Sequence, residues 1–135
     1  MSTLVRAFYV SAIVKPLSDV DVQVILGAAQ MKNRRVDVTG MLAQSNGHFA
    51  QVLEGRHEAV QETLARVARD VRHNRVRVLL EEAITRRQFE RWAMAWAYQE
   101  EIAHEMRLLH ECDLPDAERA RALLARLVPS DVGWL

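Results

Sequence analysis

The sequence lacks most features that mark secreted, membrane-spanning or nucleic-acid-binding proteins. Its single cysteine, Cys112, cannot form an internal disulfide, and only His110 lies near it at metal-ligand spacing, which is too little for a zinc site. Eighteen basic and eighteen acidic residues cancel, and no basic stripe occurs. No apolar run could span a membrane, and the N-terminus lacks a signal-peptide pattern. We therefore predict a cytoplasmic protein that binds no metal, nucleic acid or membrane.

What the sequence does contain is one domain's worth of core-forming residues, since half of its 135 residues are hydrophobic. Runs of β-prone residues predict strands at about 4–11, 38–45, 48–54, 75–84 and 92–98, with the fourth as a central strand. Helical spacing of apolar residues predicts one helix from Ser18 to about Asn33 and another from just after Gly55 through Val71. The order βαββαβ predicts a ferredoxin-like α+β fold, with two helices on one face of an antiparallel or mixed sheet and an added fifth strand.

The Asn-Gly pair at 46–47 predicts a β-hairpin and fixes its register. Both residues tolerate the positive φ angles of a type I′ turn, the commonest two-residue hairpin turn. The resulting register puts Leu42 opposite Gln51, and alternation places Gln51 on the same face as Phe49 and Leu53, where a hydrocarbon is the usual choice. A buried amide needs hydrogen-bond partners, so we expect Gln51 to meet a polar group of the protein or of a ligand.

Two more polar side chains lie on apolar faces of neighbouring elements. Tyr9 shares one face of the first strand with small residues. In the helix that follows, Ile25, Ala29 and Asn33 repeat every four residues along one face, so an amide ends this apolar line. These elements adjoin the hairpin in a ferredoxin-like sandwich. The phenol of Tyr9 and the amides of Asn33 and Gln51 can therefore converge.

The last third of the chain is predicted to add one strand and two helices. Large and small residues alternate from Trp92 to Tyr98, which favours a strand, although a helix also satisfies the spacing of the aromatic residues. Amphipathic helices are expected near 102–109 and 114–127. We divide the chain into a domain at 1–98 and a C-terminal helical extension at 99–135, which packs on the uncovered face of the sheet or on a partner.

Taken with their flanks, these residues resemble the BLUF family, blue-light sensors that bind FAD without a covalent link. The similarity covers about the first 98 residues, and five segments match in the family's order: Phe8-Tyr9-Val10-Ser11, Asn33 to Gly40, Gly47 to Gly55, Asp70 to His73, and Trp92-Ala93-Met94. Each segment alone is weak, but five in order at family-like spacing are a strong match.

The resemblance implies a flavin ring lying between the two helices. Ile25 is then expected to pack on the ring, Asn33 to hydrogen-bond its pyrimidine edge, and Gln51 to bridge Tyr9 and the flavin. FAD is the implied cofactor, and FMN or riboflavin can take its place in a recombinant preparation. The full set of flavin-binding residues that the resemblance implies is Ile25, Lys32, Asn33, Phe49, Gln51, Asp70, Arg72 and His73.

The resemblance also implies a photosensory signalling protein rather than an enzyme. Light drives an electron and a proton from Tyr9 to the flavin, and the Gln51 amide then rotates or tautomerises, which shifts the absorption to the red. Trp92 and Met94 are expected to repack and to relay the change to the C-terminal helices or to a partner. We expect a stand-alone receptor, dimeric or larger, that acts by binding an unidentified effector protein.

Other function classes fit parts of the sequence. Tyr9 and Gln51 can be ordinary buried residues, and Asn33 can cap the end of its helix without any ligand. An acylphosphatase-like enzyme needs an anion-binding loop after the first strand, but residues 12–18 offer Lys15 and no Arg or Gly run. A cofactor-free interaction module that dimerises through its sheet is a third class. A folded protein that stays colourless after flavin is added would favour that third class.

Overall fold

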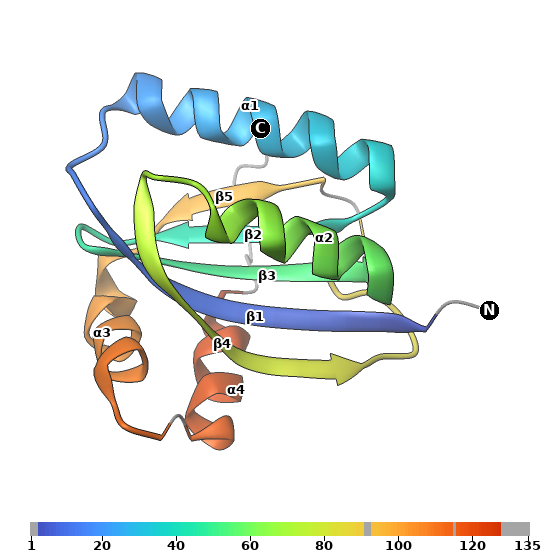
Figure 1. The fold of residues 1–135 in the computed structure, drawn as a ribbon. Coiled ribbons are helices and arrows are strands. Elements are labelled where there is room, and N and C mark those ends of the chain that lie inside the picture. Colours follow the sequence, from blue (N-terminus) through green and yellow to red (C-terminus); the bar gives the residue numbers. More distant parts are fainter. Residues whose placement is uncertain (1–2, 91–92, 115, 128–135) are drawn as a thin grey trace.

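The computed structural model describes residues 3–90, 93–114 and 116–127 (Figure 1). These residues form a mixed five-stranded sheet with the strand order β4-β1-β3-β2-β5, and the predicted ferredoxin-like α+β fold is confirmed. The strands are β1 (Leu4–Ile13), β2 (Thr39–Gln44), β3 (His48–Arg56), β4 (His73–Ala83) and β5 (Ala95–Tyr98). The helices are α1 (Asp19–Val36), α2 (His57–Ala68), the 3-10 turn η1 (Glu100–Ile102), α3 (Ala103–Glu111) and α4 (Ala117–Arg126).

The sheet separates two hydrophobic cores. Helices α1 and α2 lie on one face, and α3 and α4 lie on the other (Figure 1). Alternation along β1 divides its side chains accordingly: Ala7 and Tyr9 belong to the core beneath α1 and α2, whereas Phe8 and Val10 belong to the core shared with α3 and α4. Residues of α3 and α4, including Met106 and the buried leucines of α4, thus cover the face that the two main helices leave open.

The predicted hairpin register is confirmed, but the predicted type I′ turn is wrong. Leu42 pairs with Gln51, and the Ser45 N–H donates to the His48 carbonyl oxygen at 2.9 Å. Neither residue of the pair at 46–47 has a positive φ. Contacts with other elements determine this turn instead, because Gly47 accepts a hydrogen bond from the Ile13 N–H and the Asn46 N–H donates to Glu100.

The helix boundaries partly follow the predictions. Ser18 and Asp21 form the expected capping box, but α1 continues past Asn33 to Val36, where Asp37 adopts a left-handed conformation at the C-cap. Asn33 is therefore not a helix cap. The second helix ends at Ala68, so Val71 lies beyond it and is 85% exposed.

The outer strands also differ from the predictions. β4 is at one edge of the sheet rather than at its centre. Apolar side chains on both faces of β4 pack against the two cores. Leu80 belongs to the core shared with α4, and Val76 packs beside the core under α2. At the opposite edge, β5 pairs parallel to β2 over residues 95–98. The predicted fifth strand is thus present but shorter, and Trp92 lies outside the described residues.

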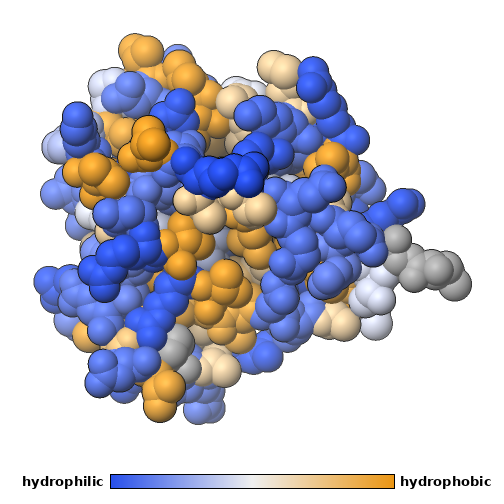
Figure 2. Space-filling model, in the orientation of Figure 1, coloured by the Kyte–Doolittle hydropathy of each residue, from blue (hydrophilic) through white to orange (hydrophobic). Residues whose placement is uncertain are grey.

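The face of the molecule in Figure 2 is mostly hydrophilic, with apolar side chains gathered over α1 in its upper part. Val20, Val24 and Met31 are more than half exposed on this helix. Among the described residues, no helix combines the length and the apolar character needed to cross a membrane.

Gly40 is predicted to be required for the close approach of β2 and β3. A Cβ at this position would overlap the carbonyl oxygen of Val52, whereas a Cβ at Gly27 on α1 would meet no atom within 4 Å. We expect Gly40→Ala to lower the free energy of unfolding by about 1–3 kcal/mol, the usual cost of overpacking. The matched change Gly27→Ala should raise it by roughly 0.5–1 kcal/mol, because alanine favours a helix interior over glycine. Urea unfolding measures the free energy of unfolding of both variants. Equal changes in the two variants would contradict the role assigned to Gly40.

Candidate functional site

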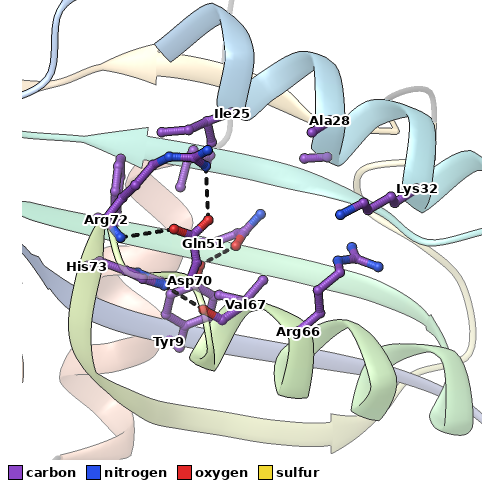
Figure 3. Close-up of a pocket in the computed structure, with 13 residues that line it drawn as sticks. Tyr9, Ile25, Ala28, Lys32, Gln51, Arg66, Val67, Asp70, Arg72 and His73 are labelled. Atoms are coloured by element: carbon purple, nitrogen blue, oxygen red, sulfur yellow. Dashed lines mark hydrogen bonds and ion pairs between the residues drawn. The ribbon is translucent and has the colours of Figure 1, made fainter. Parts of the chain in front are cut away.

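A cavity of about 230 Å³ lies between the sheet, α1 and α2 (Figure 3). The sheet supplies its floor, α1 and α2 supply its walls, and the segment between α2 and β4 lies at one end. Apolar side chains and an amide lie next to a set of charged groups around this space. The lining residues are Tyr9, Ile25, Ala28, Ala29, Lys32, Leu42, Phe49, Gln51, Arg66, Val67, Asp70, Arg72 and His73.

A phenol and an amide are hydrogen-bonded at the floor of this cavity. Tyr9 on β1 and Gln51 on β3 are directly opposite each other in the strand register, and both are at most 5% exposed. The Tyr9 hydroxyl donates to Gln51 Oε1, and Gln51 Nε2 donates to the thioether sulfur of Met94 at 3.1 Å. A thioether is only a weak acceptor. The amide N–H groups of Gln51 can therefore serve a stronger acceptor placed in the cavity.

The Tyr9 phenol is kept neutral by its surroundings. Burial raises the pKa of Tyr9 well above its usual value near 10, and the negative charge of Asp70 raises the pKa further. The hydroxyl therefore remains protonated at neutral and mildly alkaline pH. Its hydrogen is held in the bond to Gln51.

The His73 imidazole lines the cavity beside Tyr9 and Gln51 and is held by contacts at both ring nitrogens. Its Nε2 lies 2.7 Å from the carbonyl oxygen of Val67, which can only accept, so Nε2 carries a hydrogen. Its Nδ1 lies 2.7 Å from Ser11 Oγ, which donates to it when the ring is neutral. The imidazole edge also meets the rings of Tyr9 and Phe49, with centroids 6.2 and 5.9 Å away.

Three cationic side chains and one carboxylate surround the cavity. Arg72 pairs with Asp70 at 3.0 Å, and its own backbone N–H donates to the same carboxylate at 2.9 Å, so the two residues form a local turn (Figure 3). Lys32 on α1 and Arg66 on α2 add positive charge from the two helices. Three positive charges and one negative charge give the cavity a net positive charge, which favours a ligand that is rich in carbonyl oxygens or phosphates.

Of the predicted flavin-binding residues, all except Asn33 line the cavity. The buried side chain of Asn33 donates to the carbonyl oxygen of Ala93 at 2.9 Å and accepts from Arg66 Nη2 at 3.1 Å. Its contact with a flavin stays a prediction. Of the two predicted relay residues, Met94 touches Gln51, and Trp92 lies outside the described residues.

Sequence reasoning missed Arg66, Gln30 and Ser11. Arg66 directly precedes Val67, which follows Val60 and Leu64 at helical spacing, and this place beside the apolar face of α2 was the available signal. Gln30 and Ser11 act through bonds to residues more than 60 positions away, which local patterns do not reveal.

The lining fits a flat aromatic ring with polar edges. Ile25, Leu42 and Phe49 offer apolar surface, while the Gln51 amide and the nearby cations offer donors for ring carbonyls. Ligand pockets usually measure about 300–1,000 Å³, so this smaller cavity suits a ring system rather than a whole dinucleotide. No group of three or more His, Cys, Asp or Glu residues in the described part of the chain is placed to hold a metal ion.

Comparison with known proteins agrees with this chemistry. A family model described as BLUF, sensors of blue-light using FAD, matches residues 4–95. The beta subunit of photoactivated adenylate cyclase from Euglena gracilis is 31% identical over 103 residues, which cover 76% of this chain. The matched region is 12% of that relative, so this chain corresponds to a small part of a much longer protein.

Solved structures show the same relationship. The dark state of BlrB, a BLUF protein, is 30% identical with a TM-score of 0.72, and the match covers 94% of this chain and 99% of that one. The photo-activated state of BlsA shares the fold with a TM-score of 0.81 at 23% identity, over 98% of this chain and 99% of that one. The family model spans well over half of the sequence, and the chain therefore belongs to the BLUF family of blue-light sensors that use a flavin.

Proposed function

We propose that this chain senses blue light through a hydrogen-bond switch made of Tyr9 and Gln51, with FAD as its chromophore. The observation that carries the proposal is the buried hydrogen bond from the Tyr9 hydroxyl to Gln51 Oε1, beside a cavity that fits a flavin ring. Bound flavin absorbs blue light and in its excited state is a strong one-electron oxidant. The remaining steps belong to the protein's own side chains.

Tyr9 is suited to release an electron together with a proton. Its buried hydroxyl points at one acceptor, Gln51 Oε1, so its proton has a defined path. A neutral phenol does not ionise at neutral pH in such a site, which keeps the dark state stable until light supplies the driving force.

Gln51 is suited to change its hydrogen-bond pattern. The two ends of its amide have similar shapes but opposite hydrogen-bonding character, so rotation or tautomerisation exchanges donor and acceptor at little steric cost. The change would alter the hydrogen bonds offered to the ring, which accounts for a small red shift without covalent chemistry. A glutamate could not offer the same pair of ends.

The cationic side chains that line the cavity are suited to hold the polar tail of a flavin. Lys32 and Arg72 line the cavity together with Ile25, and their positive charges would hold the ribityl or phosphate part of a flavin bound there. The phosphates of FAD would complement these cations. Chromatography of the flavin released on unfolding distinguishes FAD from FMN and riboflavin.

The output of the chain is proposed to be binding rather than catalysis. Photoactivated adenylate cyclases are among its relatives, and the region they share with it is a small part of their length. We infer that this chain supplies sensing and passes the signal to an effector, through Trp92, Met94 and the C-terminal helices. Its cytoplasmic location and its self-association remain predictions.

Absorption spectra before and after blue illumination test the proposal. The wild-type protein should be yellow, shift to the red and recover in the dark. Gln51→Leu should bind flavin but not shift, because leucine offers neither end of the amide. Gln44→Leu is the matched control, since Gln44 is an equally buried strand amide that binds Trp96 instead of lining the cavity. A normal photocycle in Gln51→Leu, or a folded protein that stays colourless with added flavin, would refute the proposal.

A further inference from the structure

Two side chains of α1 hold the backbone just ahead of β5. Gln30 Nε2 donates to the carbonyl oxygen of Met94 at 3.0 Å, and Asn33 Nδ2 donates to that of Ala93 at 2.9 Å. The strand pairing of β5 starts only at Ala95. These two amides therefore attach α1 to a segment that the sheet itself does not hold.

Met94 accepts hydrogen bonds through both its side chain and its backbone. Its sulfur accepts from Gln51 Nε2 at 3.1 Å, and its carbonyl oxygen accepts from Gln30. Its side chain is only 2% exposed, so it cannot move without displacing its neighbours. One residue thus links the amide at the cavity floor to the first helix.

The chemistry of this link depends on which end of the amide faces the sulfur. A thioether has no hydrogen to donate, so it suits the N–H groups that Gln51 now presents. If the amide turned over, its carbonyl oxygen would face the sulfur, and two acceptors would oppose each other. Met94 would then have to shift, and a shift of its backbone would strain or break the bond to Gln30.

We propose that Gln30 is a positioning residue that couples the Gln51 amide to helix α1 through Met94. The inference rests on the proposed function, because it requires the hydrogen bonds of Gln51 to change in light. Gln30 does not line the cavity, whereas Asn33 is also bonded to the cavity residue Arg66. Gln30 is therefore the residue at which the coupling can be changed without altering the cavity wall.

Gln30→Glu tests the inference, because glutamate keeps the size of the side chain but loses the N–H that Met94 accepts. Gln23→Glu is the matched control, with the same chemical change at an exposed position of the same helix. Carbon-13 labelling of methionine methyl groups gives few NMR signals, since the chain has five methionines. Loss of one signal in Met94→Leu identifies that of Met94. If the glutamate variant fails to fold, Gln30→Ala replaces it.

We expect Gln30→Glu to move the Met94 methyl signal in both flavin-free and flavin-bound dark protein. The signals of Met41 and Met106 should stay in place, because these residues lie in the core on the other face of the sheet. Dark recovery of the red-shifted band should slow by roughly two- to tenfold, the change that loss of one neutral hydrogen bond corresponds to. Gln23→Glu should match the wild type in both measurements.

An unmoved Met94 signal, or a recovery rate equal to that of Gln23→Glu, would overturn the inference. Failure of the wild-type protein to shift in light would instead refute the proposed function, whatever the methyl signals show. The two failures are therefore distinguishable.

Discussion

Tyr9→Phe is expected to abolish the light-induced red shift while the protein still binds flavin. Phenylalanine keeps the ring that packs in the core beneath α1 and α2, so the cavity should retain its shape. The hydroxyl is lost, and with it the proton and the hydrogen bond to Gln51. Without that group the electron has no tyrosine source at this position, and the amide has no reason to reorient.

The chain offers a matched control for this change. Its other tyrosine, Tyr98, is half exposed at the end of β5 and hydrogen-bonds to Glu100. Tyr98→Phe should leave both the spectrum and the photocycle unchanged. Difference absorption spectra under identical illumination compare the two variants, and a red shift of wild-type size in Tyr9→Phe would exclude the switch that we propose.

Loss of the hydroxyl should not unfold the protein. The Gln51 oxygen loses its buried donor, which costs about 1–3 kcal/mol. Folded domains generally have about 5–15 kcal/mol of stability, so the variant should remain folded and coloured. Loss of the shift would then report on photochemistry rather than on folding.

The central pair of the site could be predicted because two local rules agree on it. A two-residue hairpin connection sets which residues of β2 and β3 pair, and alternation sets which of them face the helices. Together these rules place Gln51 on the same face as Tyr9, and the antiparallel pairing of β1 with β3 puts the two opposite each other.

Features that depend on distant partners were not predictable in the same way. The conformation of the turn at 46–47 follows from bonds to Ile13 and Glu100. The edge position of β4 escaped prediction because both cores make its sequence look like that of a central strand. The bonds of Asn33 to Arg66 and Ala93 span 33 and 60 positions, so the helix pattern gave its face but not its partners.

Glu54→Ala is expected to cause the largest loss of stability among the changes considered. Glu54 is fully buried in β3, and its carboxylate accepts from Arg6 at 2.7 and 2.8 Å. It also accepts from the backbone N–H groups of Gln88 and Phe89 at 2.8 and 2.7 Å. One charged group thus joins β1, β3 and the segment that follows β4.

Removing this carboxylate would leave the largely buried guanidinium of Arg6 without its main partner and would take an acceptor from two backbone N–H groups. Breaking a buried ion pair in this way typically costs about 3–5 kcal/mol, because one charge stays desolvated and uncompensated. Glu54→Gln should lose less, since its amide oxygen can still accept from Gln88 and Phe89.

Glu82 provides the matched control, because it is also near Arg6, at 3.7 Å, but is partly exposed, where it pairs with Arg121 at 2.9 Å. Glu82→Ala should change the free energy of unfolding by no more than about 1 kcal/mol, as for most surface ion pairs. Urea unfolding followed by circular dichroism measures all three variants. If Glu54→Ala were no more destabilising than Glu82→Ala, the carboxylate would be a dispensable contact rather than the group that joins β1, β3 and the segment that follows β4.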